Sequence, residues 1–210
     1  MKGVRILMFL LVLITPLPGV DGQESDTPVA HEVREILRAA SPSDVRQQLP
    51  RLRTQLRRDN FHWTPLMVAA AVATDPAVIH ALVAAGEDVN ARSLDDMTPL
   101  MFASAFNRDV AIVDALLEAG APVDSRTRDN WVPGYGVARY TGTNVEIGDL
   151  FAGFSLTADH DEPRQNGWTA LFFAARYNPD SAVMERLLDA GADSKTRDEA
   201  GALPIPSAAN

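Results

Sequence analysis

The stretch HWTPLMVAA at residues 62–70 returns as MTPLMFASA at 97–105 and as WTALFFAAR at 168–176. Thr64 and Thr98 are 34 residues apart, whereas Thr98 and Thr169 are 71 apart, slightly more than two periods. A period in the low thirties therefore predicts a degenerate unit between the second and third copies. The segment VPGYGVARY at 132–140 aligns with TALFFAARY at 169–177 and shares its final Ala-Arg-Tyr, so we place the degenerate unit there.

Each unit predicts a pair of short helices followed by a turn-rich finger loop. Thr64 and Thr98 are expected to cap the first helix, with a proline at the first helical position, where a missing N–H costs nothing. Eleven residues after the threonine position stands the cap of the second helix: Asp75, Asp109 and Asp180, with Thr143 in the degenerate unit. The second helix is expected to end at a glycine in the left-handed conformation: Gly86, Gly120 and Gly191.

These units resemble ankyrin repeats. The resemblance is carried by TPLMVAA followed by LVAAGEDVNAR, and by TPLMFAS followed by LLEAGAPVDSR. It implies an all-α fold, a solenoid of stacked helix–turn–helix units with projecting finger loops and a concave face that binds another protein. We place the repeats at 59–210, with units at about 59–92, 93–126, 127–162 and 163–196 and then a truncated C-terminal cap.

A helix pair without the Thr-Pro pattern is expected at 31–58, where apolar residues recur at helical spacing. Because a terminal repeat must cover one face of the stack, we interpret this pair as the N-terminal cap. Pro50 lies in its second helix and is expected to break or kink it. In the third unit, Gly134 and Gly136 each disfavour a helix by about 1 kcal/mol relative to alanine, so that unit is expected to be the weakest layer.

The first residues have the pattern of an export signal. Lys2 and Arg5 precede an unbroken apolar run at 6–14. At about 1.5 Å per residue, a helix of this run is too short for a hydrocarbon core of roughly 30 Å. We expect a signal peptide at 1–22, cleaved after Gly22, and a flexible linker at 23–30, with an uncleaved anchor as the alternative. The mature chain would then be exported, periplasmic or extracellular, without a stable membrane span.

The composition excludes several kinds of chemistry. The chain has no cysteine, which rules out disulfides, thiolate metal sites and cysteine nucleophiles. Its formal charge of −9 argues against a nucleic-acid partner. The four histidines are dispersed over different units, and neither a phosphate-binding glycine loop nor a catalytic serine motif occurs. We therefore expect a monomeric, non-catalytic module that binds a protein and has no cofactor or metal.

An alternative function rests on the segment 154–168. Gly153 and Thr169 are sixteen residues apart, against twelve in the other fingers, and loops that accept insertions often carry recognition. The sequence DHDE at 159–162 could offer oxygen atoms to a hard cation, although adjacent residues do not converge easily on one ion. With the irregular third unit, this loop is the alternative location for a small-molecule or metal-dependent hydrolytic site. A solvated acidic loop is the simpler interpretation.

A basic patch lies in the second half of the N-terminal cap, at Arg51, Arg53, Arg57 and Arg58. Such a patch could meet an anionic membrane surface or a nucleic acid. Pairing with acidic neighbours on an exposed helix is the simpler expectation in an acidic chain.

The candidate binding residues lie at the finger bases. Trp63, Trp131 and Trp168 each stand just before the capping position of a first helix, and Met97 fills this position in the second unit. Large, rigid side chains in register along a groove resemble a row of interface hot spots. They could instead stack on one another or cover the finger turns. The candidate partner-binding set is Trp63, Met97, Trp131 and Trp168, flanked by Tyr135, Tyr140 and Tyr177.

Overall fold

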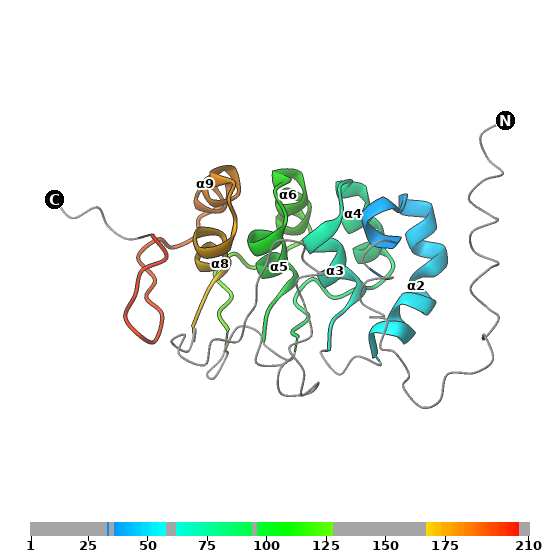
Figure 1. Ribbon diagram of the computed structural model, residues 1–210, viewed down its shortest axis with the longest axis horizontal. Helices are drawn as coiled ribbons and strands as arrows, with labels where there is room; N and C mark the ends of the chain where they lie inside the picture. The colour runs from blue at the N-terminus through cyan, green and yellow to red at the C-terminus, as the bar shows by residue number, and fades with distance from the viewer. Residues whose placement is uncertain (1–32, 34–35, 58–61, 94–95, 128–166, 206–210) are drawn as a thin grey trace, which may run out of the picture.

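The computed structural model describes residues 33, 36–57, 62–93, 96–127 and 167–205, and this part of the chain consists of helices and loops (Figure 1). The all-α class predicted from the sequence is confirmed. The helices are α2 (Pro42–Leu56), α3 (Pro65–Val72), α4 (Pro76–Ala84), α5 (Pro99–Phe106), α6 (Val110–Glu118), α8 (Ala170–Tyr177) and α9 (Ser181–Asp189).

The helices begin where the local sequence supplies a capping side chain. Thr64 Oγ1 accepts from Met67 N (3.2 Å) and Thr98 Oγ1 from Met101 N (3.3 Å), with a proline at the start of each helix. Each outer helix starts in the same way, because a carboxylate oxygen accepts from the N–H two residues on. These carboxylates belong to Asp75, Asp109 and Asp180.

Pro50 does not end α2, which runs without interruption from Pro42 to Leu56. The expected break is therefore wrong. Proline removes the hydrogen bond to the carbonyl four residues earlier, here that of Arg46. Both Pro50 and Arg46 are exposed, so water can satisfy the released carbonyl, while Leu49 and Leu52 stay buried on the opposite side.

The stack has two rows of helices. Inner helices α3, α5 and α8 pack side by side, outer helices α4, α6 and α9 lie behind them, and α2 covers the N-terminal end against α4 (Figure 1). Equivalent leucines of the outer helices, Leu82, Leu116 and Leu187, are completely buried between the rows. Burying one such side chain stabilises the fold by about 1.5–3 kcal/mol, so each layer depends on its neighbours.

Helix α8 packs directly on α5, just as α5 packs on α3. Two asparagines make the same contacts across the two boundaries. Asn107 Nδ2 donates to Ala70 O and Ala73 O, both at 3.0 Å. Asn178 Nδ2 donates to Ser104 O (3.0 Å) and Asn107 O (2.7 Å). The unit at 167–196 is therefore the next layer after the unit at 98–120.

This stacking contradicts the prediction of a degenerate unit at 127–162 as a layer between them. A helix pair inserted there would separate Asn178 from Ser104 by a full layer, about 8–10 Å, which is beyond hydrogen-bond reach. The described stack therefore has no layer between these two units, and Gly134 and Gly136 of the expected weak layer fall within 128–166. Residues 128–166 themselves lie outside the described residues.

The three fingers close with one pattern of backbone hydrogen bonds, which shows where 128–166 is inserted. The bonds at the finger base are Ser93 N to Met97 O (3.1 Å), Thr127 N to Trp168 O (2.9 Å) and Asp198 N to Ala202 O (3.0 Å). The bonds at the tip are Asp96 N to Ser93 O (2.9 Å), Gly167 N to Thr127 O (3.2 Å) and Gly201 N to Asp198 O (3.0 Å). Residues 94–95 and 199–200 are the tips of the first and third fingers, so 128–166 takes the place of a two-residue tip in the second.

Candidate protein-binding surface

The fingers are tied to one another by a row of arginines. Arg92 Nη1 donates to Arg126 O at 2.7 Å, and Arg126 Nη2 donates to Arg197 O at 3.3 Å. Arg92 also pairs with Asp96 at its own finger tip (3.0 Å). Each arginine immediately precedes the first residue of the finger turn; Arg92 and Arg126 reach the next finger, and Arg197 Nη1 donates to Gly201 O of its own finger at 2.6 Å. The described parts of the fingers are therefore held in register, as a rigid binding surface requires.

The finger loops display polar side chains at their surface, of which Asp124 also accepts from Asp193 N of the next finger at 3.1 Å. Asp88, Asn90, Asp124 and Lys195 are all exposed. Asp193, also exposed, accepts hydrogen bonds from Lys195 N (2.9 Å) and from the Thr196 hydroxyl (2.9 Å). The bond from the Lys195 backbone and that from Thr196 lower the pKa of Asp193, so its carboxylate stays charged to a lower pH than an ordinary aspartate does.

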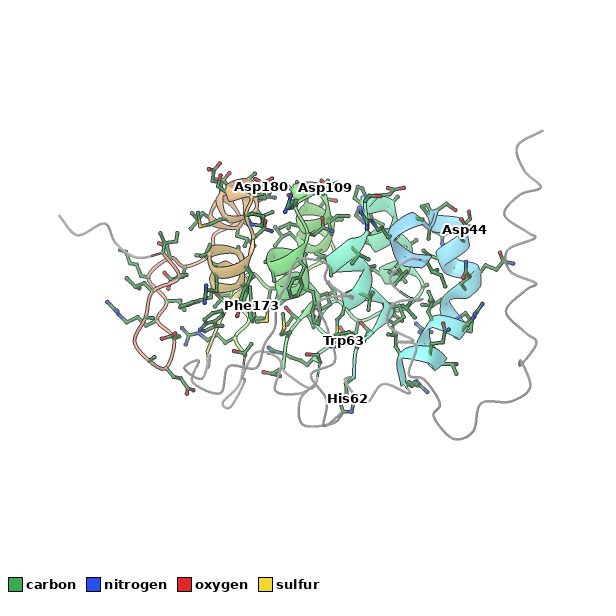
Figure 2. All side chains as sticks on the ribbon, viewed as in Figure 1. Asp44, His62, Trp63, Asp109, Phe173 and Asp180 are labelled. Atoms are coloured by element: carbon green, nitrogen blue, oxygen red, sulfur yellow. The ribbon has the colours of Figure 1, made fainter. Side chains whose placement is uncertain are left out.

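The inner helices carry apolar side chains at two equivalent positions, which we call the inner row: Val68, Val72, Phe102, Phe106, Phe173 and Tyr177. Its members form i, i+4 pairs, and such pairs share one helix face. The Phe102 and Phe106 rings are 6.1 Å apart, and the equivalent Phe173 and Tyr177 rings are 6.3 Å apart. Figure 2 shows Phe173 and Trp63 between the fingers and the outer edge marked by Asp109 and Asp180.

Comparison with protein-family models gave two matches to this chain. A model described as ankyrin repeats in three copies matches residues 33–127, and a single ankyrin repeat matches 166–196. Together they cover more than half of the 210 residues. The chain belongs to the ankyrin-repeat family. The interval between the two matches falls within the second finger of the ankyrin stack. A search of curated proteins gave no match.

Two of the predicted binding residues of this ankyrin-repeat chain are packed inside the stack. Met97 is 6% exposed and Trp168 is 7% exposed. The Trp168 ring lies 5.5 Å from that of Phe172 and 5.4 Å from that of Phe173. Its indole N–H donates to Asp198 Oδ2 at 3.2 Å, which links the second finger to the third. These contacts favour packing over display as the role of Trp168.

Trp63 is half-buried at the base of the first ankyrin unit, and its ring meets Phe102 of the next unit edge to face at 5.8 Å. Tyr177 is half-buried beside Trp168, at 6.0 Å between ring centres. The contacts of both are with aromatic side chains of the inner helices and of the finger base. Trp131, Tyr135 and Tyr140 lie outside the described residues.

Side chains able to hold a metal ion do not gather in the part of the ankyrin chain that the structure describes. No group of three histidine, cysteine, aspartate or glutamate side chains is placed there to hold a metal ion. His62 is exposed at a finger base, and His80 lies on α4 with its Nε2 3.7 Å from a Glu118 oxygen. The predicted alternative site at 154–168 falls outside the described residues except for Gly167 and Trp168.

Of the basic patch predicted in the N-terminal cap, Arg53 pairs with an acidic neighbour. Its Nε donates to Glu87 Oε1 at 2.7 Å, and Nη2 approaches Ala85 O at 3.4 Å. Glu87 follows the glycine that ends α4, and its side chain is only 5% exposed. The expectation that Arg53 forms an ion pair is confirmed, and the pair fastens α2 to the first ankyrin unit.

The arginine row was missed in the sequence, although its signal is present. Arg92, Arg126 and Arg197 end the segments NAR, DSR and KTR and repeat with the spacings of the units, 34 and 71. Together with Ser93, Thr127 and Asp198, which follow them, they mark the start of each finger turn. This alignment would have located the finger turn of the second unit at Thr127.

Proposed function

We propose that this ankyrin-repeat chain is a non-catalytic interaction module that binds another protein, mainly through its fingers. The observation that carries the proposal is the arginine row, which joins three fingers in register while leaving polar side chains in the finger loops exposed. A surface already held in its binding geometry loses little conformational entropy when a partner docks. The family supports the same conclusion, because ankyrin repeats are generally protein–protein interaction modules.

The finger loops also suggest how the partner is recognised. They carry exposed acidic side chains, Asp88, Asp124 and Asp193. The cations among them are Lys195 and the three arginines of the row, whose guanidinium groups already donate to finger carbonyls. Together with the acidic balance of the whole chain, the carboxylates favour a partner surface rich in lysine or arginine. Charge complementarity of this kind mainly raises the association rate and makes it depend on ionic strength.

Site-specific photocrosslinking in the native cell tests this proposal. A photoreactive residue at Asn90, Asp124 or Lys195 should capture one predominant protein species, identified by mass spectrometry. Ala84 and Ser181 are exposed on the outer helices and provide matched control positions. Capture only from the outer helices, or none from any finger position, would count against the fingers as the binding surface.

We further propose that the module works outside the cytoplasm as a monomer, with 1–22 acting as a cleaved signal peptide. The support is the basic start and short apolar run of the sequence, together with its lack of cysteine. Among the described helices, none is long and apolar enough to cross a membrane. A mature N-terminus at Gln23, found by mass spectrometry of the protein from its native cell, is the expected result. Retention of residues 1–22 in a membrane fraction would favour the uncleaved anchor.

A further inference from the structure

Helix α2 carries a line of positive charge, although the chain as a whole has a formal charge of −9. Arg46 is followed by Arg53 and then by Arg57, which continues the helical backbone as the C-cap. These intervals are close to two and three helical turns, so the three side chains lie along one side of the helix. We call them the α2 stripe. The stripe lies at the N-terminal end of the stack, opposite the end formed by α9 (Figure 1).

The carboxylates closest to the α2 stripe are already engaged. Glu87 accepts from Arg53 at 2.7 Å, and Asp44, the acidic residue of α2 itself, belongs to the capping box that starts the helix. Arg46 and Arg57 are both exposed. Among the described residues, no ion pair is made to either of them. Two of the three guanidinium groups are therefore available to an anion from outside the chain.

Helix stability alone does not explain the α2 stripe. A cation in the last turn of a helix interacts favourably with the macrodipole, which accounts for Arg57. Arg46 lies in the first half of α2, where this interaction gives it no benefit. Arg53 and Arg57 are four residues apart, a spacing at which like charges destabilise a helix. An anion bound along the stripe would offset this repulsion.

The side chains around the α2 stripe favour one kind of anionic partner. Protein interfaces are anchored by apolar and aromatic side chains at their centre. Pro50 is the one apolar residue among the exposed residues of α2, a helix that the structure describes along its whole length. An anionic bilayer needs no such anchor, because it attracts a basic helix through charge. Arginine suits its headgroups, since a guanidinium donates two parallel hydrogen bonds to a phosphate.

We propose that the α2 stripe binds an anionic lipid surface. The contact is peripheral and involves no membrane span. The same surface repels the exposed carboxylates of the finger loops, Asp88, Asp124 and Asp193, so the stack approaches it with its N-terminal end. This inference goes beyond the proposed function. It gives the module an orientation in which α2 meets the lipid and the fingers stay open to the partner protein.

Vesicle flotation of the full chain tests the proposal. The vesicles contain either phosphatidylcholine alone or an equimolar mixture of phosphatidylcholine and phosphatidylglycerol. Wild-type protein should prefer the anionic vesicles, and Arg46→Gln and Arg57→Gln should each lower its partitioning onto them about fivefold. Every variant has the same residues 1–22, so any lipid contact of that segment cancels in the comparison.

Two control variants separate the α2 stripe from net charge. Arg108→Gln removes the same charge from an exposed position outside α2 and should change partitioning less than about twofold, because the attraction is screened beyond a Debye length. Arg46→Lys keeps the charge and should keep most of the binding. Raising the salt concentration should abolish the preference of the wild-type protein for anionic vesicles.

Several outcomes would overturn the proposal. The first is that the wild-type chain binds both kinds of vesicle equally. The second is that the double variant Arg46→Gln with Arg57→Gln binds anionic vesicles as well as the wild type does. A polyglutamate peptide and a DNA duplex are the soluble probes. If one of them binds through Arg46 and Arg57 while the vesicles are not distinguished, the occupant is an acidic protein segment or a nucleic acid.

Discussion

Replacing Asn178 by alanine tests whether the unit at 167–196 stacks directly on the unit at 98–120. The side chain donates to Ser104 O (3.0 Å) and Asn107 O (2.7 Å), and its Oδ1 accepts from Asp180 N (3.0 Å). At about 1 kcal/mol for each hydrogen bond, Asn178→Ala should lower the free energy of unfolding by about 3 kcal/mol. Ser104 and Asn107 lie across the boundary between the two units, whereas Asp180 is in the same unit as Asn178, so about two thirds of the loss measures the strength of that boundary.

Urea unfolding followed by circular dichroism measures this loss, with two matched variants beside it. Asn107→Ala removes the equivalent bonds to Ala70 O and Ala73 O and should cost a similar amount. Asn90→Ala, in an exposed part of the first finger, should change stability by less than about 0.5 kcal/mol.

The same substitution should cost as much in the protein whose 128–166 segment is replaced by Glu-Ala. The two units that Asn178 joins are both still present there, so its hydrogen bonds are unchanged. The refuting outcome is that Asn178→Ala lowers the free energy of unfolding by less than about 0.5 kcal/mol while Asn107→Ala lowers it by about 3 kcal/mol. Asn178 would then not bridge these layers, and the direct stacking of α8 on α5 would be refuted.

Three further results are expected. Trp168→Ala should destabilise the fold by about 3–5 kcal/mol, measured by urea unfolding, because its ring is buried among aromatic neighbours; Trp63→Ala, half-buried, should cost less. Leu116→Ala should cost about 2–5 kcal/mol in the same assay, because its side chain is completely buried between the helix rows. Bonds from the Ser41 hydroxyl and backbone lower the pKa of Asp44, so Ser41→Ala should raise that pKa toward its ordinary value in an NMR titration. A lowered carboxyl pKa stabilises the fold at pH values above the ordinary pKa, and this stabilisation is lost as the pH falls through the lowered pKa of the folded state. Ser41→Ala should therefore weaken the acid dependence of stability.

The helices could be predicted because their boundaries are set within each unit. The threonine, aspartate and glycine at these boundaries act on backbone groups a few residues away, so each copy of the pattern specifies its own helix pair. Thr169 lacks the capping hydrogen bond that Thr64 and Thr98 make, yet α8 still forms at the expected place. Packing against α5 and α9 therefore helps to determine where α8 forms.

The role of the tryptophans could not be predicted in this way. Trp63 and Trp168 each precede the threonine at the start of an inner helix, as their spacing in the sequence shows. Their burial differs because of what surrounds them: Trp168 is next to Phe172, Phe173 and Tyr177, and donates to Asp198 of the following finger. Partners contributed by another unit are not visible in the period of the repeat.

The misplaced layer has a more specific cause, since the sequence contains two possible continuations after Thr127. The segment VPGYGVARY fits the repeat pattern at 132–140, which suggests that a unit starts there. Gly167 and Trp168 offer the other continuation, and the observed finger closes with Gly167 at φ 74°, close to Asp96 at 61° and Gly201 at 81°. Closing the turn at Gly167 also brings Arg126 to the Arg197 carbonyl and Asn178 to the Asn107 carbonyl. The finger turn, the arginine contact and the asparagine contact therefore form together. A unit starting at Trp131 would have its own finger base but would separate those partners. Because the tip residues of a finger contribute none of these contacts, the turn can accept an insertion there without disturbing the stack on either side.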